Sequence, residues 1–232
     1  MILIPVKNLS NAKQRLAKVL DQGIRRELAQ AMLADVLEAV AEYGCEDASV
    51  VTSDPFALDQ AAQLGFGVIR DQANISETDA IEMATGICTA RGVPRTLVIP
   101  GDIPLIEVED LAMIFGHAPA HGAVLVPSSD KRGTNAALRT PSDLFALRFG
   151  TDSFQPHLEA AIATNTVCVV LPLARIGLDI DNVEDLENLS AHPGSKRAQE
   201  LARKLGFGAG KPGSPASREP RAREPRVTVV EQ

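Results

Sequence analysis

The chain has 232 residues, of which 45% are hydrophobic, 23% charged and 3% aromatic, and its formal net charge is −7. This length suits one α/β domain or at most two small domains, with a core built mainly from aliphatic side chains. The negative charge and the scarcity of aromatic side chains argue against a nucleic-acid partner, but they are compatible with a local basic pocket for a small phosphate.

The cysteines and the start of the chain favour the cytoplasm. Cys45, Cys88 and Cys168 are scattered and odd in number, which is typical of reduced thiols and not of a disulfide framework or a zinc site. The apolar run Ile2–Val6 is too short for the core of a signal peptide, and no stretch approaches about 18 unbroken apolar residues. We therefore expect a cytoplasmic protein with no membrane partner.

Short β-branched runs alternate with amphipathic segments along the chain. The first strand is expected at Ile2–Val6, and a helix follows from about Gln22 to Glu42, where apolar residues recur every four positions. Strands and helices then alternate, with strands expected at 48–52, 67–69, 96–99, 123–126, 135–138 and 167–171, and helices at 55–64, 77–90, 108–115, 155–164, 183–189 and 195–205. This alternation predicts βαβ units, and hence an α/β fold with a mostly parallel sheet between helices.

The composition changes at about Gly208. From there to Gln232 the chain is rich in Pro, Arg, Glu and Gly and offers almost nothing to bury. We predict one domain over residues 1–207 and a disordered tail over 208–232. The apolar residues 227–230 could pair with an edge strand or with a partner, although a frayed terminus is the favoured interpretation.

Three cations follow the first strand, namely Lys7, Lys13 and Arg15. In an open α/β sheet, ligands gather beyond the carboxyl ends of the strands, so this loop could neutralise several negative charges. It lacks the glycines of a phosphate-binding loop of the Walker type. The alternative is a solvated basic turn before a helix capped by Ser10 or Asn11.

An acidic residue follows the fourth expected strand. The apolar run ends at Pro100 and Gly101, which expose Asp102, and Pro104 prevents an immediate helix. A carboxylate at this position, together with triphosphate oxygens and waters, is how a magnesium ion is commonly held. The alternative is that Asp102 only caps a turn.

A second acidic group lies at Asp179 and Asp181. Alternation along a strand would place both side chains on one face, and Asp181 or Asn182 would cap the helix that begins at Val183. Capping leaves the two neighbouring carboxylates unexplained, because like charges side by side need a cation or a donor between them.

Two polar turns lie between these acidic groups, at residues 130–137 and 147–157. Their amides, hydroxyls and guanidinium groups suit an anion, although each could also be an ordinary loop. His157 is interpreted as a surface or packing residue rather than a base. No serine-nucleophile elbow is present, so the carboxylates and cationic loops favour metal-assisted phosphoryl or nucleotidyl transfer over acyl transfer.

Five motifs in order carry a resemblance that covers residue 1 to about residue 205. They are Pro5-Val6-Lys7 with Ala12-Lys13-Gln14-Arg15-Leu16, Gly101-Asp102-Ile103-Pro104-Leu105, Gly133-Thr134-Asn135-Ala136, Phe149-Gly150 with Ser153-Phe154, and Asp179-Ile180-Asp181. With these motifs the chain resembles the CofC/FbiD guanylyltransferases, which activate a phosphorylated three-carbon acid for the biosynthesis of the deazaflavin coenzyme F-420.

The resemblance implies a single-domain, Rossmann-like nucleotidyltransferase fold of the GT-A type. The implied reaction is attack by the phosphate of the acid on the α-phosphorus of GTP, with release of pyrophosphate. The acid in the family is 2-phospho-L-lactate, phosphoenolpyruvate or 3-phospho-D-glycerate. Carried onto this sequence, the resemblance assigns roles to nine residues: Lys7, Lys13 and Arg15 would contact the triphosphate, Asp102, Asp181 and Asp179 would hold Mg2+, and Thr134, Gly150 and Ser153 would bind the phosphoacid.

The expected ligands are therefore GTP and a small phosphoacid, and the product would be handed to the next biosynthetic enzyme; a homodimer is left open. One segment departs from the family pattern, because Asn74–Ala80 replaces a Gly-Leu-Asn-like segment that is expected near the nucleobase. Two alternatives stay open: a related transferase that uses CTP, UTP or a sugar phosphate on the same fold, and a nucleotide-binding regulatory module without catalysis.

Overall fold

An eight-stranded sheet runs through the part of the chain that the computed structural model describes, which is residues 1–44, 47–73, 75–150, 152–208 and 228–230. The order of the strands is β3-β2-β1-β4-β6-β5-β7-β8. Their bounds are β1 Ile2–Val6, β2 Ala48–Thr52, β3 Gly67–Ile69, β4 Thr96–Val98, β5 Gly122–Pro127, β6 Thr134–Thr140, β7 Val167–Val170 and β8 Thr228–Val230.

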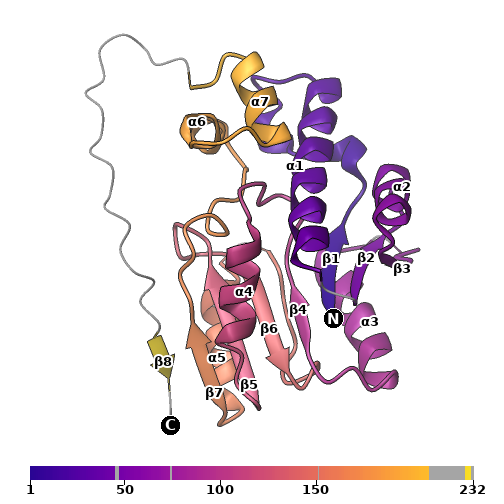
Figure 1. Ribbon diagram of the computed structural model, residues 1–232, viewed down its shortest axis with the longest axis vertical. Coiled ribbons are helices and arrows are strands. Elements are labelled where there is room, and N and C mark those ends of the chain that lie inside the picture. The colour runs from indigo at the N-terminus through magenta and orange to yellow at the C-terminus, as the bar shows by residue number, and fades with distance from the viewer. Residues whose placement is uncertain (45–46, 74, 151, 209–227, 231–232) are drawn as a thin grey trace.

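Seven α-helices of the described residues lie around this sheet (Figure 1), and two 3₁₀ turns follow β1. Their bounds are η1 Leu9–Asn11, η2 Gln14–Leu16, α1 Gln22–Tyr43, α2 Pro55–Leu64, α3 Glu77–Ala90, α4 Val108–Gly116, α5 Phe154–Ala163, α6 Val183–Ala191 and α7 Arg197–Lys204. Side-chain oxygens cap several of the helices, as Asp54 does for α2 and Ser76 for α3. Among the residues described, none of the helices combines the length and the apolar character needed to cross a bilayer.

The two faces of the sheet bury two separate cores. Alternate residues of β1 show the division, since Ile2 and Ile4 belong to one core and Leu3 to the other. The larger core packs α1, α2, α4, α6 and α7 against the sheet, and the smaller core packs α3 and α5. Because both faces are covered, the central strands are apolar throughout, and β1 and β2 are buried along their whole length.

Strand direction brings several chain segments to one edge of the sheet. The pairs β1–β2, β2–β3, β1–β4 and β5–β7 are parallel, whereas β6 lies antiparallel between β4 and β5, and β8 is antiparallel to β7. The carboxyl ends of β1, β4, β5 and β7 therefore share an edge with the start of β6. This is the edge at which open α/β sheets bind ligands.

The predicted α/β fold and mostly parallel sheet are confirmed, and the element bounds agree closely with the expected ones. The largest differences are in β6, which extends from Thr134 to Thr140 and not from 135 to 138, and in the last helix, which begins at Arg197 and not at residue 195. The predicted disordered tail falls largely on residues 209–227 and 231–232, which lie outside the described residues. Within 228–230, the preference for a frayed end is wrong, because these residues pair with β7 as β8.

One buried carboxylate fixes α7 on α1. Asp35 of α1 is 1% exposed, and its oxygens accept the backbone N–H groups of Arg197 and Ala198 at 3.0 and 2.9 Å. Asp35→Ala removes the acceptor of both N–H groups and leaves the buried one, that of Ala198, unsatisfied, so the free energy of unfolding should fall by about 2 kcal/mol in urea denaturation. The control is Glu38→Ala, which removes an exposed partner of the same arginine and should cost less than about 0.5 kcal/mol. Equal losses in the two variants would contradict this account.

Candidate active site

The loop after β1 folds as the two 3₁₀ turns η1 and η2. Asn8 caps η1, since its side-chain oxygen accepts the N–H of Ser10 at 2.9 Å. Asp21 caps α1 in the same way by accepting the N–H of Ile24 at 2.9 Å. The predicted cap at Ser10 or Asn11 is therefore wrong, because the chain makes two tight turns before the helix begins.

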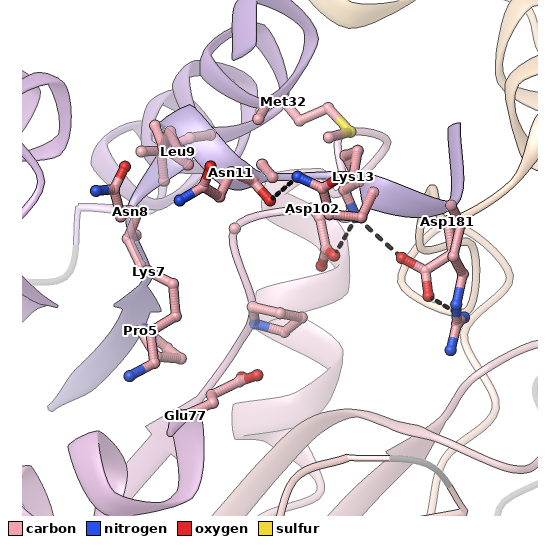
Figure 2. Close-up of a pocket in the computed structure, with 18 residues that line it drawn as sticks. Pro5, Lys7, Asn8, Leu9, Asn11, Lys13, Met32, Glu77, Asp102 and Asp181 are labelled. Atoms are coloured by element: carbon pink, nitrogen blue, oxygen red, sulfur yellow. Dashed lines mark hydrogen bonds and ion pairs between the residues drawn. The ribbon is translucent and has the colours of Figure 1, made fainter. Parts of the chain in front are cut away.

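Lys13 connects this loop to both acidic groups predicted from the sequence. Its Nζ donates to Asp102 Oδ2 at 2.6 Å and to Asp181 Oδ1 at 3.1 Å, and Arg15 reaches the other oxygen of Asp181 at 2.8 Å (Figure 2). The φ angle of Lys13 is 53°, in the left-handed region that non-glycine residues rarely adopt. Such backbone outliers concentrate at functional sites, which supports a functional role for this turn.

The ammonium group of Lys13 is largely enclosed by its partners. The Lys13 side chain is 8% exposed, whereas those of Asp102 and Asp181 are 32% and 36% exposed. Burial by itself lowers the pKa of Lys13, but the two carboxylates outweigh this effect and raise the pKa above its ordinary value. Lys13 is therefore a fixed positive charge whose two carboxylate partners still face solvent.

The two acidic segments are also joined through the backbone. The N–H of Ile180 donates to the carbonyl oxygen of Asp102 at 3.2 Å. The prediction that Asp179 and Asp181 lie on a strand is wrong, because residues 178–181 belong to the irregular connection between β7 and α6. Both side chains nevertheless line the same cleft, and Asn182 caps α6 as one of the two predicted candidates.

Asp179 is held by Asn135 on β6. The Asn135 amide donates to Asp179 Oδ1 at 3.0 Å and to the carbonyl oxygen of Ile176 at 2.9 Å. Burial raises the pKa of Asp179, and the charges of Asp102 and Asp181 add to this effect, while the bond from Asn135 opposes it. The ionised form of Asp179 is thus disfavoured by its surroundings, and a cation bound nearby would stabilise it.

The first part of the cleft, of about 400 Å³, lies over the ends of β1 and β4 (Figure 2). Lys7, Lys13 and Arg15 all line it, together with apolar side chains from α1 such as Met32. Lys7 also forms an ion pair with Asp71 at 3.3 Å. This half combines cations with an apolar wall, as a bound nucleotide requires.

Glu77 is a member of this cleft that the sequence did not single out. It begins α3, and its side chain is directed toward the space that holds Lys13 and Asp102 (Figure 2). Burial raises the pKa of Glu77 to about 7, and the charge of Asp102 adds to this, against the opposing effect of Lys13 and Lys7. The carboxyl group therefore titrates close to neutral pH.

The second part of the cleft, of about 440 Å³, shares Arg15, Glu77, Asp102 and Asp181 with the first. Its far side contains the three residues predicted to bind an acid, which are Thr134, Gly150 and Ser153, and an exposed pair of Arg132 with Asp152. The backbone N–H of Thr134 donates to Ser153 Oγ at 3.1 Å. Gly150 has a φ of 139°, which an L residue rarely adopts, so a glycine is required at this turn.

All nine predicted site residues therefore line one of the two connected parts. The sequence reasoning missed Glu77, Asn135 and the contact between His157 and Thr134. An acid at the first position of a helix is common for electrostatic reasons, and Asn135 falls inside an expected strand, so neither carried a signal for a site. His157 was expected to be a surface or packing residue; it is in fact 1% exposed and bonded to Thr134.

The sequence of this chain is similar to a known protein family and to several named proteins. A family profile described as "Guanylyl transferase CofC like" matches residues 1–223. A phosphoenolpyruvate guanylyltransferase of Roseiflexus castenholzii is 34% identical over 88% of this chain and 93% of its own. A 2-phospho-L-lactate guanylyltransferase of Methanothermobacter thermautotrophicus is 32% identical over 88% of this chain and 90% of its own.

Solved structures show the fold. A protein from Desulfovibrio desulfuricans G20 described as a nucleotide-diphospho-sugar transferase superposes with a TM-score of 0.72 at 22% identity, covering 88% of this chain and 93% of that one. A nucleotidyl transferase from Methanothermobacter gives a TM-score of 0.58 at 14% identity over 88% and 97% of the two chains. The chain therefore has the fold of these two proteins.

Glu77 provides a test of the electrostatics of the ligand-free cleft. Its folded pKa of about 7 lies above the ordinary value of 4.5, so its stabilising contribution is complete below pH 4.5 and is lost as the pH rises through 7. Glu77→Gln should therefore be more stable than the wild type by about 3 kcal/mol at pH 8, and the difference should vanish near pH 4.5.

The measurement is urea denaturation across this pH range. Glu82→Gln, at an exposed position on the same helix, is the control and should shift stability by less than about 0.5 kcal/mol at either pH. A Glu77→Gln curve parallel to the wild type at all pH values would show that Glu77 is solvated like an ordinary glutamate.

Proposed function

Because the chain belongs to the CofC-like guanylyl transferase family, we propose that it transfers GMP from GTP to a phosphorylated three-carbon acid in the biosynthesis of coenzyme F-420. Phosphoenolpyruvate and 2-phospho-L-lactate are the favoured acids, because the similar proteins are named for them. 3-Phospho-D-glycerate is a third candidate. The reaction releases pyrophosphate, and we propose that the following enzyme consumes the activated product.

The observation that carries this proposal is the cleft with two connected parts. The cationic half can accept the triphosphate and the polar half the acid, and Asp102, Asp181 and Arg15 line both. The two substrates would therefore meet at the acidic residues. Holding two reactants in contact in this way is a main source of rate enhancement for a transfer between two anions.

The proposed chemistry needs charge neutralisation and no base. An oxygen of the acid's phosphate forms a bond to the α-phosphorus of GTP, and the bond from that phosphorus to the bridging oxygen of the β-phosphate breaks. The nucleophile is already anionic at neutral pH, so no proton has to be removed. Lys7, Lys13 and Arg15 line the cationic half of the cleft, and we propose that they would neutralise the negative charge that develops on the triphosphate.

The donor set also fits a magnesium ion. Asp102 and Asp181 converge closely enough for one ammonium group to bond to both, and Asp179 lies in the same half of the cleft. Across the described parts of the chain, no cluster of three or more Asp, Glu, His or Cys residues is arranged as a metal cage. Magnesium is commonly held by one or two carboxylates with substrate phosphates and waters, so a cage is not required.

We propose that Asp102 and Asp181, with Asp179 as a third ligand or a support, hold Mg2+ when the nucleotide binds. The ion would supply charge neutralisation to the triphosphate and to the departing pyrophosphate. The Lys13 ammonium, released from the carboxylates, would then pair with phosphate oxygens.

The substrate assignment predicts a specific product. Purified protein with Mg2+ and GTP should release pyrophosphate with at least one of the three phosphoacids, and mass spectrometry should find GMP joined to that acid. Chelation of the metal should stop the reaction, and added Mg2+ should restore it. A preference for CTP or UTP would replace the guanylyl assignment, and no release with any nucleotide would favour a regulatory binding module.

The metal assignment predicts that Asp102→Asn lowers kcat at least about 100-fold, because it removes a ligand charge and no core volume. The melting temperature should stay within a few degrees of the wild type. Asp59→Asn, at an exposed position on α2, is the matched control and should keep full activity. Unchanged turnover in Asp102→Asn would exclude Asp102 from the metal site.

A further inference from the structure

His157 connects two segments that build the acid-binding half of the cleft. It lies in the first turn of α5 and is 1% exposed. Its Nε2 accepts the backbone N–H of Arg148 at 2.7 Å, and its Nδ1 lies 2.9 Å from the hydroxyl oxygen of Thr134. One imidazole ring thus contacts the start of the loop that carries Gly150 and the first residue of β6.

The contacts of the ring determine its tautomer. A backbone N–H only donates, so the bond from Arg148 requires an unprotonated Nε2, and a neutral ring then carries its proton on Nδ1. Burial, with a contribution from the charge of Arg139, lowers the pKa of His157 to about 4, so the ring is neutral at physiological pH. Phe149 packs edge-on against the ring, with the ring centroids 5.3 Å apart.

The tautomer in turn orients the hydroxyl group of Thr134. Because Nδ1–H donates to Thr134 Oγ1, the hydroxyl proton of Thr134 must point elsewhere, and Thr134 lines the cleft. The Ser153 hydroxyl is in a similar position, since its Oγ accepts the N–H of Thr134 and donates to no acceptor among the described residues. Each of the two hydroxyl oxygens therefore accepts a hydrogen bond within the protein. Their protons can be donated to a ligand, which suits the oxygens of an anion.

We propose that His157 is a positioning residue that sets the Thr134 hydroxyl as a donor toward the phosphoacid and aligns it with the loop that begins at Arg148. This inference rests on the proposed function for the identity of the ligand. A histidine that only filled core volume would influence stability, but it would have no special relation to Thr134 or to the affinity for the acid.

Two substitutions separate the bonds of the ring. His157→Gln can keep an acceptor near the position of Nε2 but loses the donor to Thr134, whereas His157→Asn can keep a donor near Nδ1 but loses the acceptor. We expect His157→Gln to raise KM for the phosphoacid about 10-fold, the size of one hydrogen bond to a charged group, with KM for GTP within about twofold. His157→Asn should raise KM for the phosphoacid less. His121→Asn, at an exposed position before β5, should not change KM for the phosphoacid.

A double-mutant cycle with Thr134→Val tests whether His157 changes KM for the phosphoacid through the Thr134 hydroxyl. If His157 acts through the Thr134 hydroxyl, His157→Gln should add less than about twofold to KM in the Thr134→Val background. A full 10-fold rise in that background, or an equal rise in KM for GTP, would overturn the proposal. If wild-type enzyme turns over and His157→Gln has unchanged KM values, this inference fails while the proposed function stands.

A readout independent of activity uses nitrogen NMR of the wild-type protein. His157 should show a protonated Nδ1 and an unprotonated Nε2 from pH 5 to pH 8, with its signals assigned by their loss in His157→Gln. The opposite tautomer, or a ring that becomes charged near pH 6.5, would overturn the proposal even if no substrate were known. Absence of turnover in the wild type with the expected NMR result would count against the proposed function alone.

Discussion

The bond of one lysine to two carboxylates determines how the cleft is assembled. Lys13 follows β1, Asp102 follows β4, and Asp181 precedes α6, so three distant segments meet at a single ammonium group. Without that cation, two carboxylates would face each other across a small gap at a cost in free energy. The backbone bond from Ile180 to Asp102 holds the acidic segments together independently of charge. Any cation that enters must therefore compete with Lys13 for a site that is already formed.

The two halves of the cleft present different chemical groups to a ligand. The half beside β1 gathers cations, which an anionic triphosphate requires, and the half beside β6 offers hydroxyl donors with fixed orientation. His157 is bonded at both ring nitrogens and is neutral, so it is placed to orient a hydroxyl and not to remove a proton. This agrees with a reaction whose nucleophile is ionised before it binds.

Much of this arrangement was predictable, because its signals are local. Apolar β-branched runs predict the strands, and Pro100 with Gly101 marks the turn after β4 that exposes Asp102. The prediction that Asp179 and Asp181 lie on a strand was wrong, since alternating residues over only four positions can also occur in an irregular connection. The surroundings of Glu77 and His157 could not be predicted, because burial and hydrogen-bond partners come from residues far away in the sequence.

The edges of the sheet have a consequence for solubility. Both outer strands, β3 and β8, are only three residues long. An exposed edge strand is a template for the backbone of another chain, and short edges limit how many hydrogen bonds such an encounter can form. The apolar strands β1 and β5, which would be aggregation-prone segments if exposed, each have two strands between them and the nearer edge of the sheet. A sheet that continues from one molecule to the next is accordingly disfavoured, and self-association would have to use helical or loop surfaces instead.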